Sequence, residues 1–97
     1  MTNAEAAAAL TKILAAGRTI TIQCANGDTV TVGQRHGIGT PEAPAGWFFA
    51  LRWGRSRWAL PSGKEIAQDP TANFLAWEVV RAVGRGSVGR ACKAAAA

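Results

Sequence analysis

Residues 47–60 constrain the fold more than any other stretch, because bulky apolar and basic side chains alternate along them. The stretch holds three of the four Trp, two of the three Phe and three of the eleven basic residues. Side chains of a strand alternate between the two faces of a sheet, and Gly54-Arg55 suits a two-residue type II′ turn. The stretch therefore predicts a β-hairpin that folds back at Gly54.

The alternation assigns the two faces of this predicted hairpin. Its core face would carry the bulkier apolar set, which is Trp47, Phe49, Leu51, Trp58 and Leu60. Its solvent face would carry Phe48, Ala50, Arg52, Arg57 and Ala59. Arg52 would lie directly opposite Arg57, and like charges in that position destabilise a sheet. A sequence that keeps such a pair indicates a surface that holds something negative.

The N-terminal third predicts a helix and another hairpin. Thr2 and Glu5 have the spacing of a capping box, and the Ala-rich segment after them predicts a helix to about residue 16. We expect this helix to dock on its own sheet, with docking on another chain as the alternative. Residues 18–24 and 29–32 alternate as two half-buried strands. Only a three-residue loop over 25–27, with Gly27 left-handed, sets Ile22 opposite Val30 on one face.

The rest of the chain completes the predicted architecture. Residues 33–46 predict a crossover loop, with closure over a ligand as the alternative. Residues 62–66 predict a short helical turn, and Asp69-Pro70 predicts the start of a helix that runs to about residue 83. The wide apolar arc around Trp77 leaves surplus surface for the first helix or for a partner in a homodimer.

These elements predict an α+β fold in the order α-β-β-β-β-α. We expect a four-stranded antiparallel sheet, made of the two hairpins, with the N-terminal and C-terminal helices packed on one face. Residues 1–84 would form a single domain, and residues 85–97 would form a flexible basic tail.

The formal charge of +5 is concentrated in two places, the 47–60 hairpin and the C-terminal segment. Such an asymmetry favours a polyanionic partner, which means nucleic acid or an acidic protein or nucleoprotein surface, although solubility alone is the alternative reading. Cys24 and Cys92 form no disulfide framework, and a bridge between them stays open. The first residues do not form the basic run before an apolar segment that is typical of a signal peptide, and no apolar run approaches the ~20 residues that span a bilayer. We therefore expect a soluble, cytoplasmic protein without membrane contact.

The sequence gives little support for chemistry. His36 is the only histidine, and it has no neighbouring acid to orient it in a catalytic triad. One His and two distant Cys do not have the spacing of a metal site, and Gly37-Ile38-Gly39 is not a phosphate loop. We therefore expect no enzyme activity, no cofactor and no metal.

The candidate binding residues are Arg52, Arg55 and Arg57, then Phe48 and Trp53, with Arg35 and His36 in the neighbouring loop. Arginines clamp phosphates and an exposed aromatic side chain stacks on a base, which is typical of single-strand binders. The alternatives are that the arginine stems shield Phe48 from water, and that Trp53 covers the core edge. We expect a non-catalytic binding protein whose cationic, aromatic hairpin face engages a nucleic acid or a nucleic-acid-processing complex.

A second hypothesis is inhibition of a host defence nucleoprotein by protein contact and steric blocking. In size, simplicity and basic hairpin, the chain is similar in general style to small phage or mobile-element inhibitors such as anti-CRISPR proteins. The similarity includes no shared motif, so it implies neither a fold nor any site residue.

Overall fold

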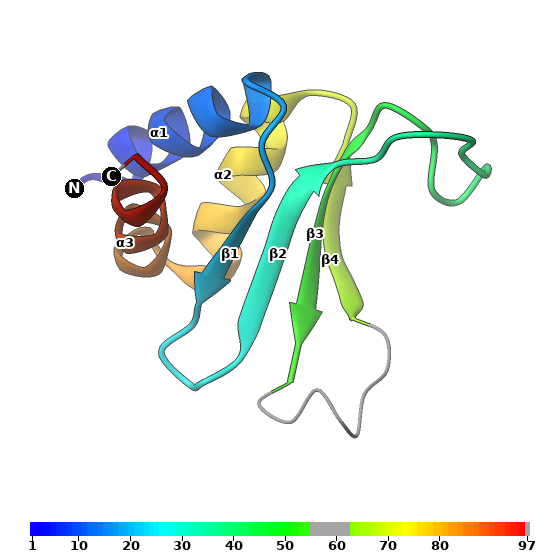
Figure 1. The fold of residues 1–97 in the computed structure, drawn as a ribbon. Coiled ribbons are helices and arrows are strands. Elements are labelled where there is room, and N and C mark those ends of the chain that lie inside the picture. The colour runs from blue at the N-terminus through cyan, green and yellow to red at the C-terminus, as the bar shows by residue number, and fades with distance from the viewer. Residues whose placement is uncertain (55–62, 97) are drawn as a thin grey trace.

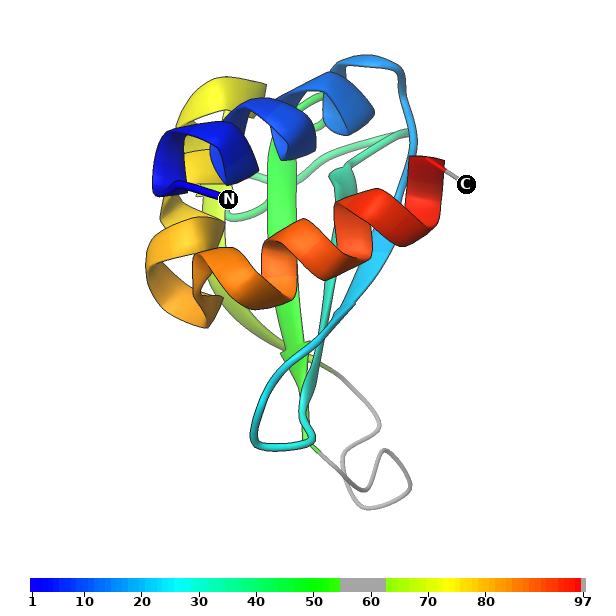
Figure 2. The ribbon, with the colours of Figure 1, turned by 90° about the vertical axis from the view of Figure 1, so that its left-hand side faces the viewer.

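The computed structural model describes residues 1–54 and 63–96. The elements follow one another as α1 (Asn3–Ala15), β1 (Ile20–Gln23), β2 (Thr29–Gln34), β3 (Phe48–Trp53), β4 (Lys64–Asp69), α2 (Ala72–Val83) and α3 (Arg85–Ala96). The strands form one antiparallel sheet in the order β1-β2-β3-β4, and the helices lie on one side of it (Figures 1 and 2). The predicted α+β fold class is confirmed, with one helix more than expected.

Helix α1 begins at the predicted capping box. The Thr2 hydroxyl accepts the Glu5 N–H at 3.1 Å, and the Glu5 carboxylate accepts the Thr2 N–H at 2.8 Å. These two hydrogen bonds hold the pKa of Glu5 below its usual value. The helix ends before Gly17, whose φ of 79° is the left-handed conformation that glycine adopts at little cost.

The first hairpin has the predicted register. Ile20 pairs with Val32 and Ile22 pairs with Val30, so all four side chains are buried under the helices. The Cys24 N–H donates to the Asp28 carbonyl at 2.8 Å, which encloses the predicted three-residue loop, and Gly27 has a φ of 92°. The confirmed loop shows that the buried face, rather than the Asn-Gly pair, sets this turn.

The predicted faces of the second hairpin are wrong. Strand β3 pairs with β2, so that Val32 lies opposite Ala50 and Val30 lies opposite Arg52. Ala50 is completely buried, so its side of β3 faces the helices. Phe48 and Arg52, two residues before and after it, share this side, which we call the helix-side parity of the strand. Helix α2 packs against β3 and β4, and Ala50 belongs to the same buried core as Leu75 and Val79 of α2. Phe49, which was expected in the core, therefore lies on the opposite side of the sheet.

The predicted partner of β3 is also wrong. The partner of β3 is β4, with Leu51 opposite Glu65 and Arg52 opposite Lys64, so Arg52 does not face Arg57 across the sheet. Residues 54–63 separate the two strands, and both Arg55 of the predicted turn and the predicted strand over residues 56–60 lie outside the described residues. In place of the expected helical turn, Lys64 and the residues after it belong to β4. This strand lacks a regular alternation and contains an irregularity opposite Ala50 and Leu51.

Helix α2 begins two residues later than predicted, with Thr71 at the N-cap. The Asp69 carboxylate accepts the Thr71 N–H at 2.8 Å, so the Asp-Pro pair forms the turn before the helix rather than its first residues. The helix buries the apolar face that the sequence indicated, which is Leu75, Ala76, Val79 and Val80.

The expected flexible tail is helix α3 instead. Val88 is fully buried and Cys92 is only 4% exposed, and α3 contacts α1, α2 and β1. Val88, Ala91, Cys92 and Ala95 have the spacing of one apolar helix face, and their small size concealed the signal. None of the helices within residues 1–54 and 63–96 has the length and apolarity needed to cross a bilayer.

Candidate binding face of the sheet

The helices leave one side of the sheet uncovered, and we call this side the open face (Figure 1). Alternation along the four strands assigns ten residues to it, which are Thr21, Gln23, Thr29, Thr31, Gly33, Phe49, Leu51, Trp53, Glu65 and Gln68. Hydroxyl and amide side chains occupy its β1 and β2 side, and a row of large apolar side chains occupies β3. The open face therefore combines hydrogen-bonding groups with an aromatic row.

The aromatic row consists of the two aromatic side chains of Phe49 and Trp53 with the aliphatic Leu51 between them, and all three are half-buried. A Cβ atom on Gly63 would lie 2.8 Å from Trp53 Cε2 and 3.1 Å from Leu51 Cβ, so the glycine allows the indole to lie against the start of β4. On the neighbouring strand, a Cβ atom on Gly33 would lie 2.6 Å from the Thr19 hydroxyl oxygen. Two glycines thus fix how closely side chains lie against this face.

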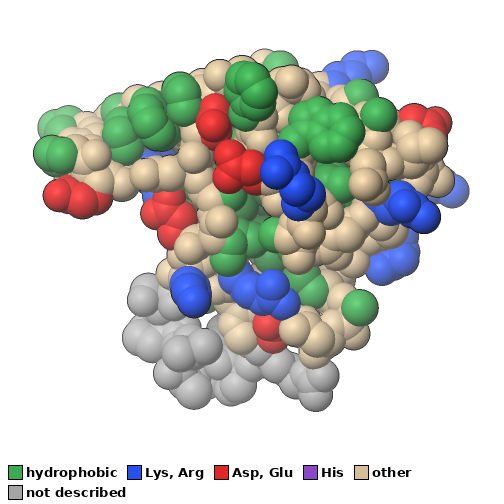
Figure 3. Space-filling model, turned by 180° about the vertical axis from the view of Figure 1, so that it is seen from behind, with side chains coloured by type: hydrophobic (Ala, Val, Ile, Leu, Met, Phe, Trp, Pro, Cys, Tyr) green, Lys and Arg blue, Asp and Glu red, His purple; other side chains and the backbone are tan. Residues whose placement is uncertain are grey.

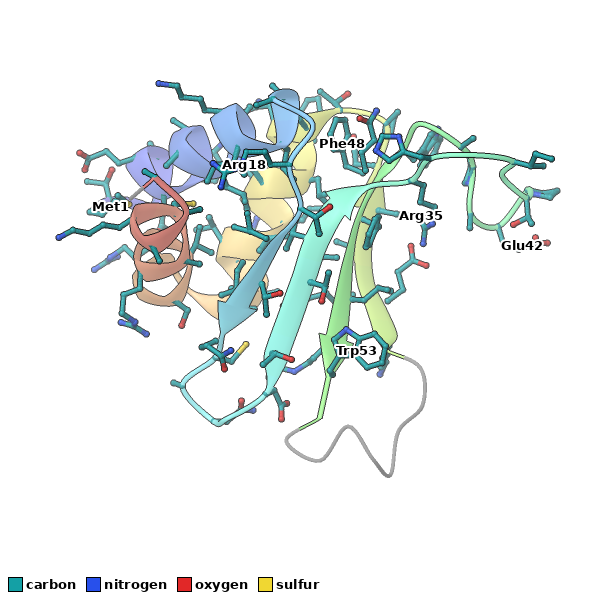
Figure 4. All side chains as sticks on the ribbon, in the orientation of Figure 1. Met1, Arg18, Arg35, Glu42, Phe48 and Trp53 are labelled. Carbon is teal, nitrogen blue, oxygen red and sulfur yellow. The ribbon has the colours of Figure 1, made fainter. Side chains whose placement is uncertain are left out.

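Arg35 brings a positive charge to the open face. Its guanidinium carbon lies 5.1 Å from the centre of the Phe49 ring, which is a cation–π contact. Its Nη1 donates to Gln68 Oε1 at 3.0 Å, and its Nη2 lies 3.4 Å from Glu65 Oε2. Gln68 in turn donates to the Glu42 carbonyl at 3.1 Å, so the 35–47 loop is tied to β4. Figure 4 shows Arg35 and Trp53 on the side of the sheet away from the helices.

The structure divides the predicted site residues between two faces. Trp53 and Arg35 belong to the open face, whereas Phe48 and Arg52 have the helix-side parity. Phe48 packs partly against the core, and His36 is exposed in the 35–47 loop. Arg55 and Arg57 lie outside the described residues.

Arg52 also has a local partner. Its Nε lies 2.9 Å from Asp28 Oδ2, in the loop of the first hairpin. Lys64 is the like charge that faces it across the sheet, and the Asp28 carboxylate offsets that repulsion. The repulsion between Arg52 and Lys64 is therefore offset within the protein. The argument that two facing cations indicate a negatively charged partner no longer applies to Arg52.

Sequence reasoning missed Phe49, Leu51, Glu65 and Gln68 as open-face residues. The available signal was that β3 carries apolar side chains on both parities, so bulk alone could not identify its core side. On the side seen in Figure 3, acidic and basic side chains are interspersed over the described surface, so this side is neither uniformly positive nor uniformly negative.

The structure contains no obvious reactive centre in its described part. No group of three or more His, Cys, Asp or Glu side chains in residues 1–54 and 63–96 comes together as a metal site. Cys24 and Cys92 are free thiols, and burial raises the pKa of the Cys92 thiol above its usual value.

Comparisons with known proteins found no match among family models, curated proteins or solved structures.

Proposed function

We propose that this chain is a non-enzymatic binding protein that engages single-stranded nucleic acid on its open face. The observation that carries the proposal is the parity of β3, which puts Phe49 and Trp53 on the uncovered side of the sheet with Arg35 beside them. Aromatic side chains on a sheet offer stacking surfaces for unpaired bases, and threonine hydroxyls and arginine bind the sugar–phosphate backbone. The aromatic hairpin face thus keeps its proposed role, but with the opposite parity from the one expected.

The ion pair of Arg35 does not prevent this role. Its side chain and that of Glu65 are 21% and 34% exposed, and their closest atoms are 3.4 Å apart. A partly exposed pair with this geometry contributes on the order of 1 kcal/mol, so a phosphate that offers a bidentate contact competes with it. The Phe49 ring and Gln68 hold the guanidinium in place for such an exchange.

Fluorescence anisotropy with a labelled single-stranded oligonucleotide, repeated at several salt concentrations, tests the proposal. We expect Trp53→Leu to weaken binding by about 1–3 kcal/mol, the usual effect of losing one stacked base. The matched control is Trp77→Leu, which removes a half-buried indole from α2 on the helix side of the sheet. It should leave the affinity unchanged.

Arg35→Gln provides the electrostatic arm of the same titration. It should lower the slope of log affinity against log salt by about 1, because one phosphate contact is lost. Arg81→Gln, at an exposed position in the last turn of α2, removes the same charge away from the open face and should not change the slope. Absence of binding at low salt, or equal losses in targets and controls, would contradict the proposal and favour a protein partner.

A further inference from the structure

A second surface, remote from the open face, runs along the seam between α1 and α3. Figure 2 shows these helices side by side in front of the sheet, running in the same general direction. Two hollows of about 670 Å³ and 280 Å³ follow one another along this seam. Ala9, Cys92 and Ala96 line both hollows, so they form one continuous groove, which we call the α1–α3 groove.

Small side chains create the groove. Ala9 on α1 and Gly89 on α3 leave the space between the helices unfilled, and Cys92 closes the floor. A Cβ atom on Gly89 would lie 3.1 Å from the Met1 sulfur, so the Met1 side chain lies against the glycine at one end. At a rise of about 1.5 Å per residue, α3 supports a groove roughly three helical turns long.

The border of the groove is basic. Five of the eleven Lys and Arg residues line it, which are Lys12, Arg18, Arg85, Arg90 and Lys93. All five are exposed, and within residues 1–54 and 63–96 no Asp or Glu lines either hollow. Arg18 donates to the Ala95 carbonyl at 3.0 Å and Arg90 donates to the Ser87 hydroxyl at 3.4 Å, so these two contacts are to neutral groups. Glu5, the one acid of α1, is engaged in the capping box.

We propose that the α1–α3 groove docks an amphipathic helix of a protein partner whose apolar face is flanked by Asp and Glu. The apolar floor and the length of α3 fit the helix-in-groove mode of recognition. The carboxylates on the flanks would complement the basic border and steer association. An open groove of this kind does not enclose a small ligand, and a second copy of the chain would bring like charges together.

The test uses a labelled synthetic peptide of three helical turns, with Leu and Ala along one face and Glu on both flanks. Arg85→Gln combined with Lys93→Gln removes two border charges and should weaken peptide binding between about twofold and thirtyfold, at the usual strength of exposed pairs. The fold should tolerate the change, because Arg85 opposes the dipole at the start of α3. The matched control, Lys64→Gln with Arg81→Gln, removes equal charge elsewhere and should have no effect.

A second pair of variants tests the floor without changing the charge. Ala9→Leu fills the space shared by the two hollows and should abolish binding, whereas Ala8→Leu, at an exposed neighbouring position outside the groove lining, should not. Peptide that binds Ala9→Leu as well as it binds the natural chain would overturn the proposal. If a scrambled peptide of the same composition binds equally well, binding depends on charge alone and not on a helix seated in the groove. That result would also overturn the proposal.

Two further probes separate other occupants from a helix. Vesicles that contain anionic lipid, or a single-stranded oligonucleotide, should bind Ala9→Leu and the natural chain equally. Loss of vesicle or oligonucleotide binding in Ala9→Leu, with no binding of the amphipathic peptide, would assign the groove to that other class of partner. Since Trp53→Leu lies on the opposite side of the sheet, failure at the groove and failure at the open face are distinguishable.

Discussion

The two hairpins of the sheet were interpreted by the same rule, that the bulkier apolar set faces the core, and only one of them obeys it. In the first hairpin, Ile20 and Ile22 lie opposite Val32 and Val30 under the helices. In β3, the side that carries the fully buried Ala50 faces the helices, and the half-buried Phe49, Leu51 and Trp53 lie on the open face. The difference shows that bulk determines the buried face only where the other parity is polar.

The residues of each hairpin explain this difference. The second parity of the first hairpin offers only Thr and Gln side chains, so a slip by one residue would bury polar groups without hydrogen-bond partners. Strand β3 has apolar side chains on both parities, and the neighbouring elements decide between them. The small Ala50 fits beneath α2, where a larger side chain would force the helix away from the sheet.

The largest expected effect lies in the first hairpin. Ile22→Ala removes a side chain that is 0% exposed and leaves a cavity beneath the helices. We expect the free energy of unfolding to fall by about 2–5 kcal/mol, measured by urea denaturation. A loss below about 1 kcal/mol would contradict the burial of Ile22 in the core, and with it the contrast between the two hairpins.

A smaller effect is expected from enlarging Ala50 in β3. Ala50→Leu inserts a bulky side chain into the fully buried space beneath α2, and we expect a loss of about 1–3 kcal/mol from overpacking in the same assay. Thr31→Leu, at a half-buried position of the open face, is the matched control and should cost less. If Ala50→Leu stabilises the protein, the alanine side of β3 faces solvent after all.

The elements with strong local signals could be predicted from the sequence. The Thr2 capping box, the Gly27 loop and the apolar arc of α2 each combine a specific turn or cap residue with a clear period, and the structure has all three. Strand β4 could not be predicted, because only Ile66 and Ala67 are apolar and pairing with β3 determines its conformation.

Helix α3 could not be predicted for a related reason. Its apolar face consists mainly of Ala and Cys, which are too small to stand out from the other residues as a hydrophobic stripe. Its two internal glycines also disfavour a helix. Packing against α1 and β1 overrides that local preference. The sequence named Trp53 and Arg35 as candidates in separate places, the hairpin and the loop before it, and it gave no signal that the pairing of β3 brings both to the open face.

The parity of β3 is tested most directly by thiol reactivity at two adjacent positions. In a Cys24→Ser background, Cys92 reacts slowly because it is buried and its pKa is raised. We predict that Leu51→Cys reacts with a thiol reagent at least about tenfold faster than Ala50→Cys, because the buried position needs local opening before it reacts. Faster reaction of Ala50→Cys would contradict the assignment of the aromatic row to the open face.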